Sequence, residues 1–241
     1  MIQRVYNTRL SKRSREESSI LMNDPDQFHE TGYVIRRYFW APSDPVFDAV
    51  CKKARVCDRK YIGIFKKRYD KRRRFQYEWP DGPYHARWQT PFLTKLIKGA
   101  QELVSDVLYA DSPSFLKSIP GCTKQPAHAD YLPTDLEGVA VTEYPIGCLV
   151  SLQNDTFFDI WPGCFATNIE SKQGVTRSVS VSLQAGDVLY FRADLIHAGS
   201  EYNQTNYRMH CYLNTEMVQH RHNRTWRVDY QPLLVQKLIQ E

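Results

Sequence analysis

The sequence predicts one domain with an all-β core of the sandwich or barrel type and helices flanking it. Beyond residue 113, short runs of β-forming residues alternate with turn-forming residues, and no helix-length periodic segment interrupts them until the last residues. The N-terminal half holds two amphipathic segments of helical length. A chain of 241 residues, with 42% apolar and 13% aromatic residues, suffices for one packed domain of this kind.

The predicted core strands are rich in Val, Ile, Leu, Phe and Tyr. They cover residues 115–119, 146–153, 157–161, 179–183, 187–191 and 207–213. Strands that follow one another without helices between them favour a sandwich or barrel over alternating βαβ units. We therefore assign residues 113–215 to the core and 216–241 to a C-terminal extension, with a short helix expected at 233–238.

The segment 26–112 is predicted to support one face of this core. A helical turn is expected at 26–31, and a strand at 33–39 follows Gly32. An amphipathic helix is expected at 43–57.

A second helix is predicted to begin with Thr90 as N-cap and Pro91 at its first position, with an apolar stripe that runs to Leu108. Such a stripe must lie against a large surface, so we expect these helices to pack on one sheet. Residues 59–87 show no clear period and are expected to be mostly loop, and 1–25 a flexible basic tail.

Composition excludes several classes of protein. No run approaches the roughly 20 apolar residues that cross a bilayer, and the first residues lack the apolar stretch of a secretory signal. Six cysteines without a C-x-x-C pair predict neither a zinc knuckle nor a disulfide scaffold. We expect a cytoplasmic protein, with the nucleus as an alternative and organelle import less favoured; no pattern specifies an oligomer.

A candidate metal site lies within the β region. On a strand, His128 and Asp130 point the same way, because side chains alternate with period two. A second imidazole, that of His197, can reach the same point from a strand across the barrel. Two imidazole nitrogens and one carboxylate oxygen on one face of a metal form the facial triad of non-heme iron(II) oxygenases, which leaves other coordination positions open.

Arg208 is the second half of the predicted site. It follows His197 by eleven residues and lies within an apolar, β-prone run, where an unpaired guanidinium would be costly. A guanidinium grips a carboxylate through two parallel hydrogen bonds, which suits the distal carboxylate of a dicarboxylic keto acid beside the metal. The alternative is an internal Asp or Glu as its partner.

The order H-x-D, distant H, then R resembles the double-stranded β-helix (jelly-roll, cupin-like) oxygenases that use iron(II) and 2-oxoglutarate, over roughly residues 115–214. Within that superfamily the chain is similar to the phytanoyl-CoA-dioxygenase-like group. Residues 28–35 (FHETGYVI) resemble its N-terminal F-x-x-x-G-Y element, and 184–191 (QAGDVLYF) its G-D-x-x-x-F strand. One departure is Pro162-Gly163-Cys164-Phe165, where the group usually has P-G-S-H, so a His placed near the substrate is missing.

The resemblance implies Fe(II), 2-oxoglutarate and O2 as cofactor and cosubstrates, with ascorbate as a supporting reductant. It implies a dioxygenase that hydroxylates a substrate and releases succinate and CO2. The expected catalytic residues are His128, Asp130, His197 and Arg208. Further candidates for the cosubstrate are His210, which shares the parity of Arg208, Ser151 as a polar neighbour, and Gln125 and Lys117 for the proximal carboxylate.

Several nearby residues have a structural interpretation instead. Tyr131 and Trp161 are expected to pack at the barrel mouth, and Tyr212 is a weaker candidate than His210. The pair His220 and His222 forms an H-x-H pattern in a polar setting without a third partner, which favours a solvated loop.

The positive charge is local. Residues 52–74 hold twelve Lys or Arg against two Asp, whereas the whole chain has a net charge of +5. The run 66–74, followed by Phe75, Tyr77 and Trp79, has the basic and aromatic residues of a single-stranded nucleic-acid platform. A base-oxidising oxygenase is thus one alternative, beside a small-molecule, peptide or acyl substrate. A different class is a non-catalytic cupin-like binding protein, against which the complete set of four site residues speaks.

Overall fold

The computed structural model describes residues 24–56, 58–64, 73–79, 83–105, 107–168, 178–220 and 225–227. Its strands are β1 (Tyr33–Arg36), β2 (Ile62–Gly63), β3 (Arg74–Glu78), β4 (Tyr109–Ser118), β5 (His128–Ala129), β6 (Ile146–Ser151), β7 (Thr156–Phe165), β8 (Val179–Leu183), β9 (Val188–Arg192), β10 (Leu195–Gly199), β11 (Asn206–Asn214) and β12 (Trp226–Arg227). Its α-helices are α1 (Asp24–Thr31), α2 (Pro45–Val56) and α3 (Pro83–Ala100), and short 3-10 turns lie at Asp58–Lys60, Pro133–Asp135 and Val141–Glu143.

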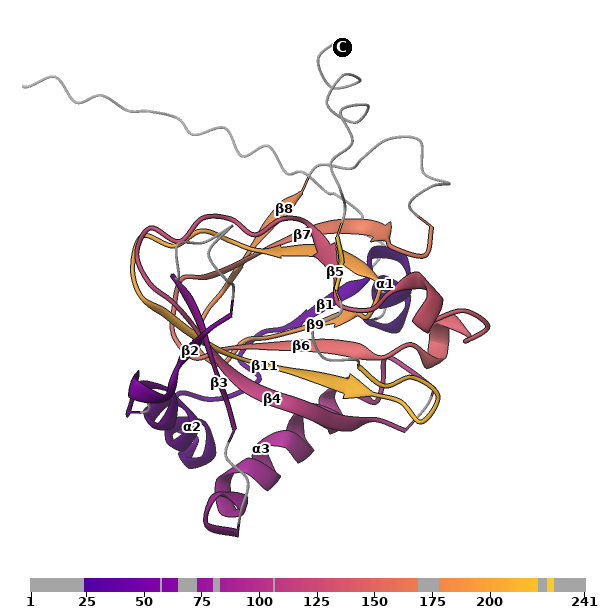
Figure 1. Ribbon diagram of the computed structural model, residues 1–241. Helices are drawn as coiled ribbons and strands as arrows, with labels where there is room; N and C mark the ends of the chain where they lie inside the picture. The colour runs from indigo at the N-terminus through magenta and orange to yellow at the C-terminus, as the bar shows by residue number, and fades with distance from the viewer. Residues whose placement is uncertain are drawn as a thin grey trace, which may run out of the picture.

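The described strands form two antiparallel sheets that lie face to face (Figure 1). One has seven strands in the order β1-β9-β6-β11-β4-β3-β2, and the other five in the order β12-β5-β10-β7-β8. From β4 to β11 the chain passes back and forth between the layers, staying in one only for the β7–β8 hairpin. This winding is that of a jelly roll, or double-stranded β-helix. The predicted fold class is confirmed.

Three additional strands lengthen the seven-stranded sheet. β1 pairs with β9 at one edge, while β3 pairs with β4, and β2 with β3, at the other. The prediction that residues 59–87 are mostly loop is therefore wrong where the structure describes them, because β2, β3 and the start of α3 lie there. β3 forms because Tyr77 and Trp79 are buried in the core under the helices. The sequence around it has no regular pattern of apolar residues from which this strand could be predicted.

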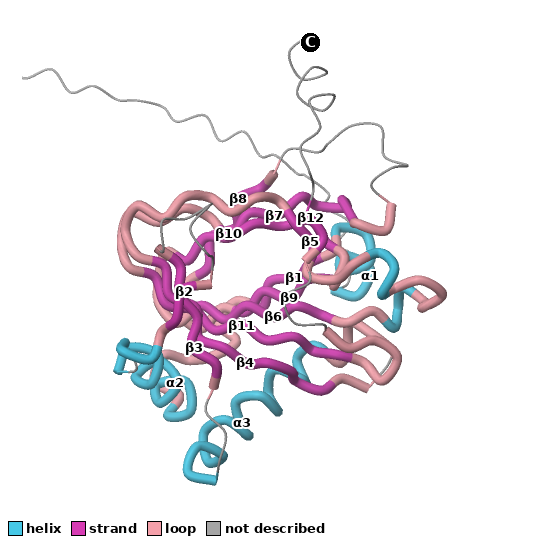
Figure 2. The backbone as a smooth tube through the Cα atoms, viewed as in Figure 1, coloured by secondary structure: helices cyan, strands magenta, loops and turns pink. Residues whose placement is uncertain are grey.

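The helices α2 and α3 cover the outer face of the seven-stranded sheet, as Figure 2 shows. α3 begins at Pro83, so Pro91 lies inside the helix instead of at its start, and the helix ends at Ala100 instead of near residue 108. An interior proline costs about 3 kcal/mol. The completely buried Phe92 and Leu96, one and five positions later, offset this cost.

The predicted helix at 233–238 and residues 1–23 of the predicted tail lie outside the described residues.

Side-chain alternation divides the seven-stranded sheet into two different faces. Phe115 and Met209 are register partners on β4 and β11, and both belong to the core under the helices. Arg208, one position away, therefore points to the other face, toward the space between the sheets. Because the helices bury the outer face as well, strands of this sheet carry apolar residues on both sides.

A buried ion pair fixes the turn between β9 and β10. Arg192 and Asp194 form two hydrogen bonds, with Nε–Oδ1 at 3.1 Å and Nη2–Oδ2 at 2.9 Å, and neither side chain is more than 5% exposed. Arg192 also donates to the His29 carbonyl, and Thr167 donates to Asp194. The pair thus ties α1 and the end of β7 to the turn that leads into β10.

No helix among the described residues has the length and apolar character of a membrane span.

Asp194→Ala is expected to destabilise the protein by about 3–5 kcal/mol, because it leaves the Arg192 guanidinium buried without its countercharge. Asp48→Ala removes the exposed partner of Lys52 and is expected to cost at most about 0.5 kcal/mol. Urea unfolding followed by circular dichroism measures both. Equal midpoints for the two variants would contradict the role given to the buried pair.

Candidate metal centre and its cavity

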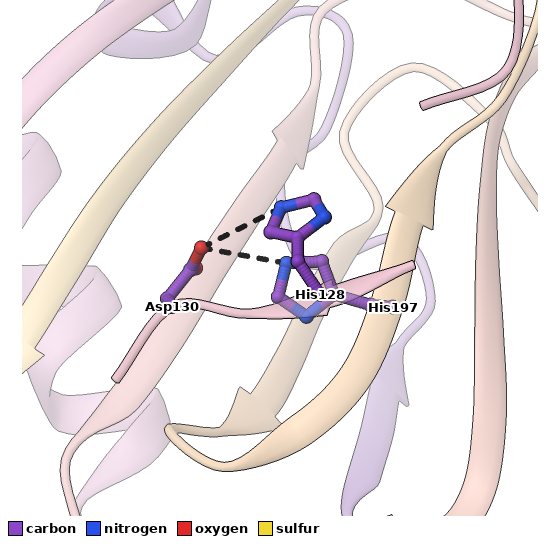
Figure 3. Close-up of side chains that lie close together, drawn as sticks. All are labelled: His128, Asp130 and His197. Atoms are coloured by element: carbon purple, nitrogen blue, oxygen red, sulfur yellow. Dashed lines mark ion pairs between the residues drawn. The ribbon is translucent and has the colours of Figure 1, made fainter. Parts of the chain in front are cut away.

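His128, Asp130 and His197 meet between the sheets (Figure 3). Their ligand atoms all lie within 4.8 Å of one another. The Asp130 Oδ1 atom is 3.5 Å from Nε2 of His197 and 3.8 Å from Nε2 of His128. His128 and His197 are register partners on the neighbouring strands β5 and β10, so the two imidazoles come from adjacent strands of one sheet instead of from opposite sides of the barrel.

The backbone sets the orientation of both imidazoles. Nδ1 of His128 lies 2.8 Å from the Pro126 carbonyl, and Nδ1 of His197 lies 2.9 Å from the Leu195 carbonyl. A carbonyl oxygen only accepts, so each Nδ1 carries a proton and Nε2 is the nitrogen left to bind a metal. Two imidazole Nε2 atoms and the Asp130 carboxylate therefore form the donor set of a facial triad.

The Asp130 carboxylate is held in its charged form although it is buried. Burial raises its pKa, but the interactions with His197, His210 and His128 together outweigh burial and hold the pKa well below the usual range. Burial lowers the pKa of His210 to about 4, against an opposing effect of Asp130, and the ring is therefore neutral near pH 7. The site thus combines an anionic oxygen ligand with imidazole nitrogens, a donor set that suits a divalent cation.

A cavity of about 190 Å³ opens next to this cluster. Its lining residues come from both sheets and from the segment before β5. They are Ile64, Arg74, Gln76, Leu116, Thr123, Lys124, Gln125, Pro126, His128, Asp130, Leu149, Phe158, His197, Arg208, His210, Tyr212 and Thr225. Phe158 stacks on His197 with ring centroids 5.2 Å apart, and so forms an apolar wall beside one imidazole. Room for a small ligand therefore adjoins the three predicted metal ligands.

Arg208 lines the same cavity and is 4% exposed. Its Nη1 donates to Ser118 Oγ at 3.0 Å and lies 3.4 Å from Asn206 Oδ1, and the guanidinium carbon is 5.4 Å from the centre of the Tyr202 ring. Among the described residues no carboxylate contacts it. The internal Asp or Glu considered from the sequence is thus not found in this part of the chain, and an anion in the cavity would supply the missing charge.

Gln125 also lines the cavity, with its amide fixed by β10. Its Oε1 accepts from the Gly199 N–H at 2.8 Å, and its own backbone N–H donates to the Gly199 carbonyl at 2.9 Å. A Cβ at Gly199 would lie 2.2 Å from Gln125 Oε1 and 2.9 Å from Nη1 of Arg74. Glycine here therefore allows the close approach of three chain segments, and a larger residue would displace the Gln125 amide or the Arg74 guanidinium.

Two of the predicted cosubstrate residues are not among those that line the cavity. Lys117 shares its parity with Phe115, so it points to the outer face, where its Nζ lies 5.8 Å from the Tyr61 ring and 5.7 Å from the Tyr207 ring. Ser151 is completely buried, with its hydroxyl 2.6 Å from the Gln153 carbonyl. Lys117 therefore does not face the metal side, and its prediction as a cosubstrate residue is wrong. Ser151 is buried behind the residues that line the cavity.

Ser151 still connects indirectly to Arg208. Its hydroxyl bonds to Thr156 Oγ1 at 2.7 Å, Asn206 Nδ2 donates to the same oxygen at 2.9 Å, and Asn206 Oδ1 faces Arg208. The parity argument placed Ser151 on the correct face, since it is the register partner of Arg208. Strand β6 ends at Ser151, however, and the Ser151 hydroxyl bonds to the Gln153 carbonyl in the turn that follows.

His210 and Tyr212 line the cavity as their shared parity with Arg208 predicts. His210 Nε2 lies 3.8 Å from Asp130 Oδ2. The Tyr212 ring stacks on His220 at 3.5 Å, so the prediction of a solvated loop is wrong for His220, whereas His222 lies outside the described residues. Tyr131 donates to Asn214 Oδ1 at 2.6 Å and is buried, in agreement with its packing interpretation.

Trp161 is 5% exposed and is likewise absent from the cavity lining. Lys124 places its Nζ 5.1 Å from the centre of the Trp161 ring. Trp161 is therefore buried outside the cavity lining, next to Lys124.

Arg74, Tyr77 and Trp79 of the predicted nucleic-acid platform are buried, whereas Arg73 and Phe75 are partly buried. Tyr77 and Trp79 are 9% and 7% exposed, and both pack in the core under the helices. Arg74 is 1% exposed and lines the cavity instead of the surface. Sequence reasoning had counted Arg74 among the exposed charges and missed it as a site residue. Residues 66–72 lie outside the described part of the chain.

Comparison with known proteins identifies the fold. No family model and no curated protein matches the chain. Among solved structures, SnoN, a non-heme alpha-ketoglutarate-dependent epimerase from nogalamycin biosynthesis, is 14% identical with a TM-score of 0.60, covering 87% of this chain and 86% of its own. SnoK, the carbocyclase of that biosynthesis, is 15% identical with a TM-score of 0.60, covering 90% and 91%. The fold is shared.

A prolyl-4-hydroxylase from Pseudomonas putida shows the same likeness, with 11% identity, a TM-score of 0.59 and coverage of 80% of this chain and 97% of its own. The similarity in each case spans most of both chains. The fold of this chain is thus similar to that of an epimerase, a carbocyclase and a prolyl-4-hydroxylase.

Gly199→Ala is expected to weaken metal binding at least about tenfold, because the added Cβ must displace the Gln125 amide or Arg74 from the end of the strand that carries His197. Gly63→Ala is the matched control, since nothing lies within 4 Å of a Cβ at Gly63. Calorimetric titration with Mn²⁺ measures the affinity. Unchanged Mn²⁺ affinity in Gly199→Ala would contradict the steric argument.

Proposed function

We propose that the protein is an iron(II)- and 2-oxoglutarate-dependent oxygenase that hydroxylates its substrate and releases succinate and CO2. The observation that carries this proposal is one cavity lined by two unlike groups. Two imidazole Nε2 atoms and a carboxylate converge in its wall, and a buried guanidinium in the same wall has no carboxylate partner among the described residues. A ligand with a metal-binding keto acid group and a distal carboxylate matches both groups.

The residues of the chain have separate roles in this proposal. His128, Asp130 and His197 hold iron(II), with the Nδ1 hydrogen bonds of the histidines keeping Nε2 available. Arg208 orients 2-oxoglutarate by its distal carboxylate. Bound iron(II), with 2-oxoglutarate and O2 as cosubstrates and ascorbate as supporting reductant, supplies the oxidising chemistry. Phe158 and Phe191 shield His197 from water on the apolar side.

What similar proteins bind supports the choice of cofactor. One structure of SnoN holds Fe3+, alpha-ketoglutarate and nogalamycin RO. The same fold serves an epimerase, a carbocyclase and a prolyl hydroxylase. Hydroxylation is therefore our proposal for the outcome, and the fold by itself is compatible with other oxidations of a C–H bond.

The phytanoyl-CoA-dioxygenase-like group remains the finer proposal. Its two motifs, 28–35 and 184–191, are neighbours in space, because β1 pairs with β9. Gly186 adopts φ +89°, and a Cβ added there would lie 2.1 Å from the Trp40 carbonyl oxygen. Both features explain why the second motif has a glycine at this position. Phe165 stands where that group has a substrate-side His and is buried among apolar residues, so we do not extend the proposal to an acyl-CoA substrate.

Turnover of 2-oxoglutarate tests the function. With iron(II), ascorbate and O2, the wild-type protein is expected to form succinate even without its substrate, at a slow uncoupled rate. His197→Ala and Asp130→Ala are expected to lose this activity at least about a hundredfold, because each removes one of three ligands. His85→Ala, on α3 and absent from the cavity lining, is the control.

The same experiment separates the alternatives. Stabilisation by Mn²⁺ and 2-oxoglutarate, seen as a rise in Tm, with no succinate formation would identify a cupin-like binding protein. Equal succinate formation by wild type and His197→Ala would show that the triad is not the reaction centre. A base-oxidising activity would require succinate formation that increases with single-stranded nucleic acid and decreases with salt.

A further inference from the structure

The three predicted metal ligands are held in the fold in different ways. His128 lies on β5 and His197 on β10, and the two residues are register partners. Asp130 lies in a bend just beyond the two-residue strand β5, so its backbone is not part of the strand ladder. Its carboxylate oxygens lie 3.5 to 3.8 Å from imidazole nitrogens of the site. The position of this carboxylate therefore depends on what holds the bend.

Tyr131 ties this bend to the opposite sheet. It directly follows Asp130, is 1% exposed, and donates from its hydroxyl to Oδ1 of Asn214 at 2.6 Å. Asn214 is the last residue of β11, the strand that carries Arg208. Because Asn214 shares the parity of Arg208, its side chain points to the space between the sheets. The hydrogen bond thus runs from the segment of a metal ligand to the strand of the cavity arginine.

The orientation of the Asn214 amide is fixed by its other partners. Its Nδ2 donates to Oδ2 of Asp111 at 3.0 Å, and its Oδ1 also accepts from the His220 N–H at 3.0 Å. A carboxylate only accepts, so the amide nitrogen must face Asp111, which leaves the amide oxygen for Tyr131. Asn214 is 1% exposed, so water does not replace these partners.

A β-bulge aims the Asp111 carboxylate at this position. The inward-pointing residues His210 and Tyr212 of β11 are two positions apart, whereas their register partners on β4, Ser114 and Asp111, are three positions apart. β4 therefore has one extra residue there, and Ser112 in this bulge adopts φ +50°. In a regular strand Asp111 would point to the outer face of the sheet. The strained residue thus turns a carboxylate inward.

We propose that Tyr131 and Asn214 are positioning residues that fix the metal ligand Asp130 relative to the strand that carries Arg208. This inference rests on the proposed function, in which Asp130 binds iron(II) and Arg208 binds 2-oxoglutarate. The hydrogen bonds from Asp111 through Asn214 to Tyr131 hold the bend in place. Without them the Asp130 carboxylate moves relative to the two imidazoles, and metal binding weakens before any cosubstrate is present.

A purely structural role for Tyr131 predicts a different result. Its ring belongs to an apolar cluster with Leu136, Tyr144 and Val218, and Tyr131→Phe keeps the ring in that cluster. If the hydroxyl only stabilises the fold, its loss lowers Tm and leaves the metal affinity of the folded protein unchanged. A positioning role lowers the metal affinity of protein that is fully folded.

The experiment is calorimetric titration with Mn²⁺ at a temperature where every variant is folded. In Tyr131→Phe we expect the Mn²⁺ affinity to fall about tenfold, the smaller end of the effect of losing outer support for a metal ligand. Tyr190→Phe is the matched control, because it removes a completely buried hydroxyl that donates to the Leu96 carbonyl at 2.9 Å in the core under the helices. The control should lower Tm to a similar degree and keep the wild-type affinity.

A reciprocal exchange tests the next hydrogen bond of the chain. Asn214→Asp alone places two carboxylates against each other and is expected to lower the Mn²⁺ affinity about tenfold. Adding Asp111→Asn restores one donor and one acceptor with their places exchanged, and the carboxylate at position 214 still accepts from Tyr131. The double variant should therefore recover the wild-type affinity to within about threefold.

Unchanged Mn²⁺ affinity in folded Tyr131→Phe, or an equal loss in Tyr190→Phe, overturns the inference. If Tyr131→Phe does not fold, the exchange carries the test: a folded double variant that binds Mn²⁺ no better than Asn214→Asp contradicts the proposal. A wild-type protein that does not bind Mn²⁺ refutes the proposed function and this inference with it. A wild type that binds Mn²⁺ and 2-oxoglutarate, with Tyr131→Phe binding both as tightly, refutes only the positioning role.

Discussion

The burial of charged groups between two largely apolar layers is the constraint on which the site depends. Asp130, Arg208 and Arg74 are 6%, 4% and 1% exposed. Removing such groups from water costs several kcal/mol each, so the fold must compensate every one of them. Imidazoles surround Asp130 and carbonyl oxygens surround Arg74. For Arg208 the described residues offer a hydroxyl and an amide oxygen but no carboxylate, and an anionic ligand would complete this compensation.

The two sheets contribute different residues to the site. The five-stranded sheet and its loops provide His128, Asp130 and His197, whereas the seven-stranded sheet provides Arg208 and Arg74. Stacked sheets lie about 10 Å apart, so a ligand held by both layers would be short. The helices α2 and α3 keep the outer face of the seven-stranded sheet dry. Their packing fixes which residues of β4 and β11 point inward, and in this way a distant apolar interface determines the chemistry of the cavity.

The sequence predicted the parts of the site that depend on local spacing. The H-x-D pattern, the later His197 and the parity of Arg208 and His210 are short-range regularities, and the structure brings these residues together. Lys117 was misplaced for a physical reason. Both faces of β4 are buried, so polarity does not distinguish the inner face from the outer one, and the lysine stem lies over Tyr61 and Tyr207 with its ammonium at the ring faces.

Arg74 and α3 show where long-range contacts override local signals. Thr90 and Pro91 form a good helix start in isolation. The helix nevertheless extends back to Pro83, because the partly buried Trp88 packs against the same core as the buried Phe92 and Leu96. Arg74 belongs to a run of basic residues that resembles a solvated surface, and nothing within that run distinguishes it. Its burial depends on carbonyl oxygens of Thr123 and Ser200, more than forty residues away in sequence. A charge changes from a surface feature into part of a binding site only when such acceptors converge on it, and that convergence is a property of the folded chain.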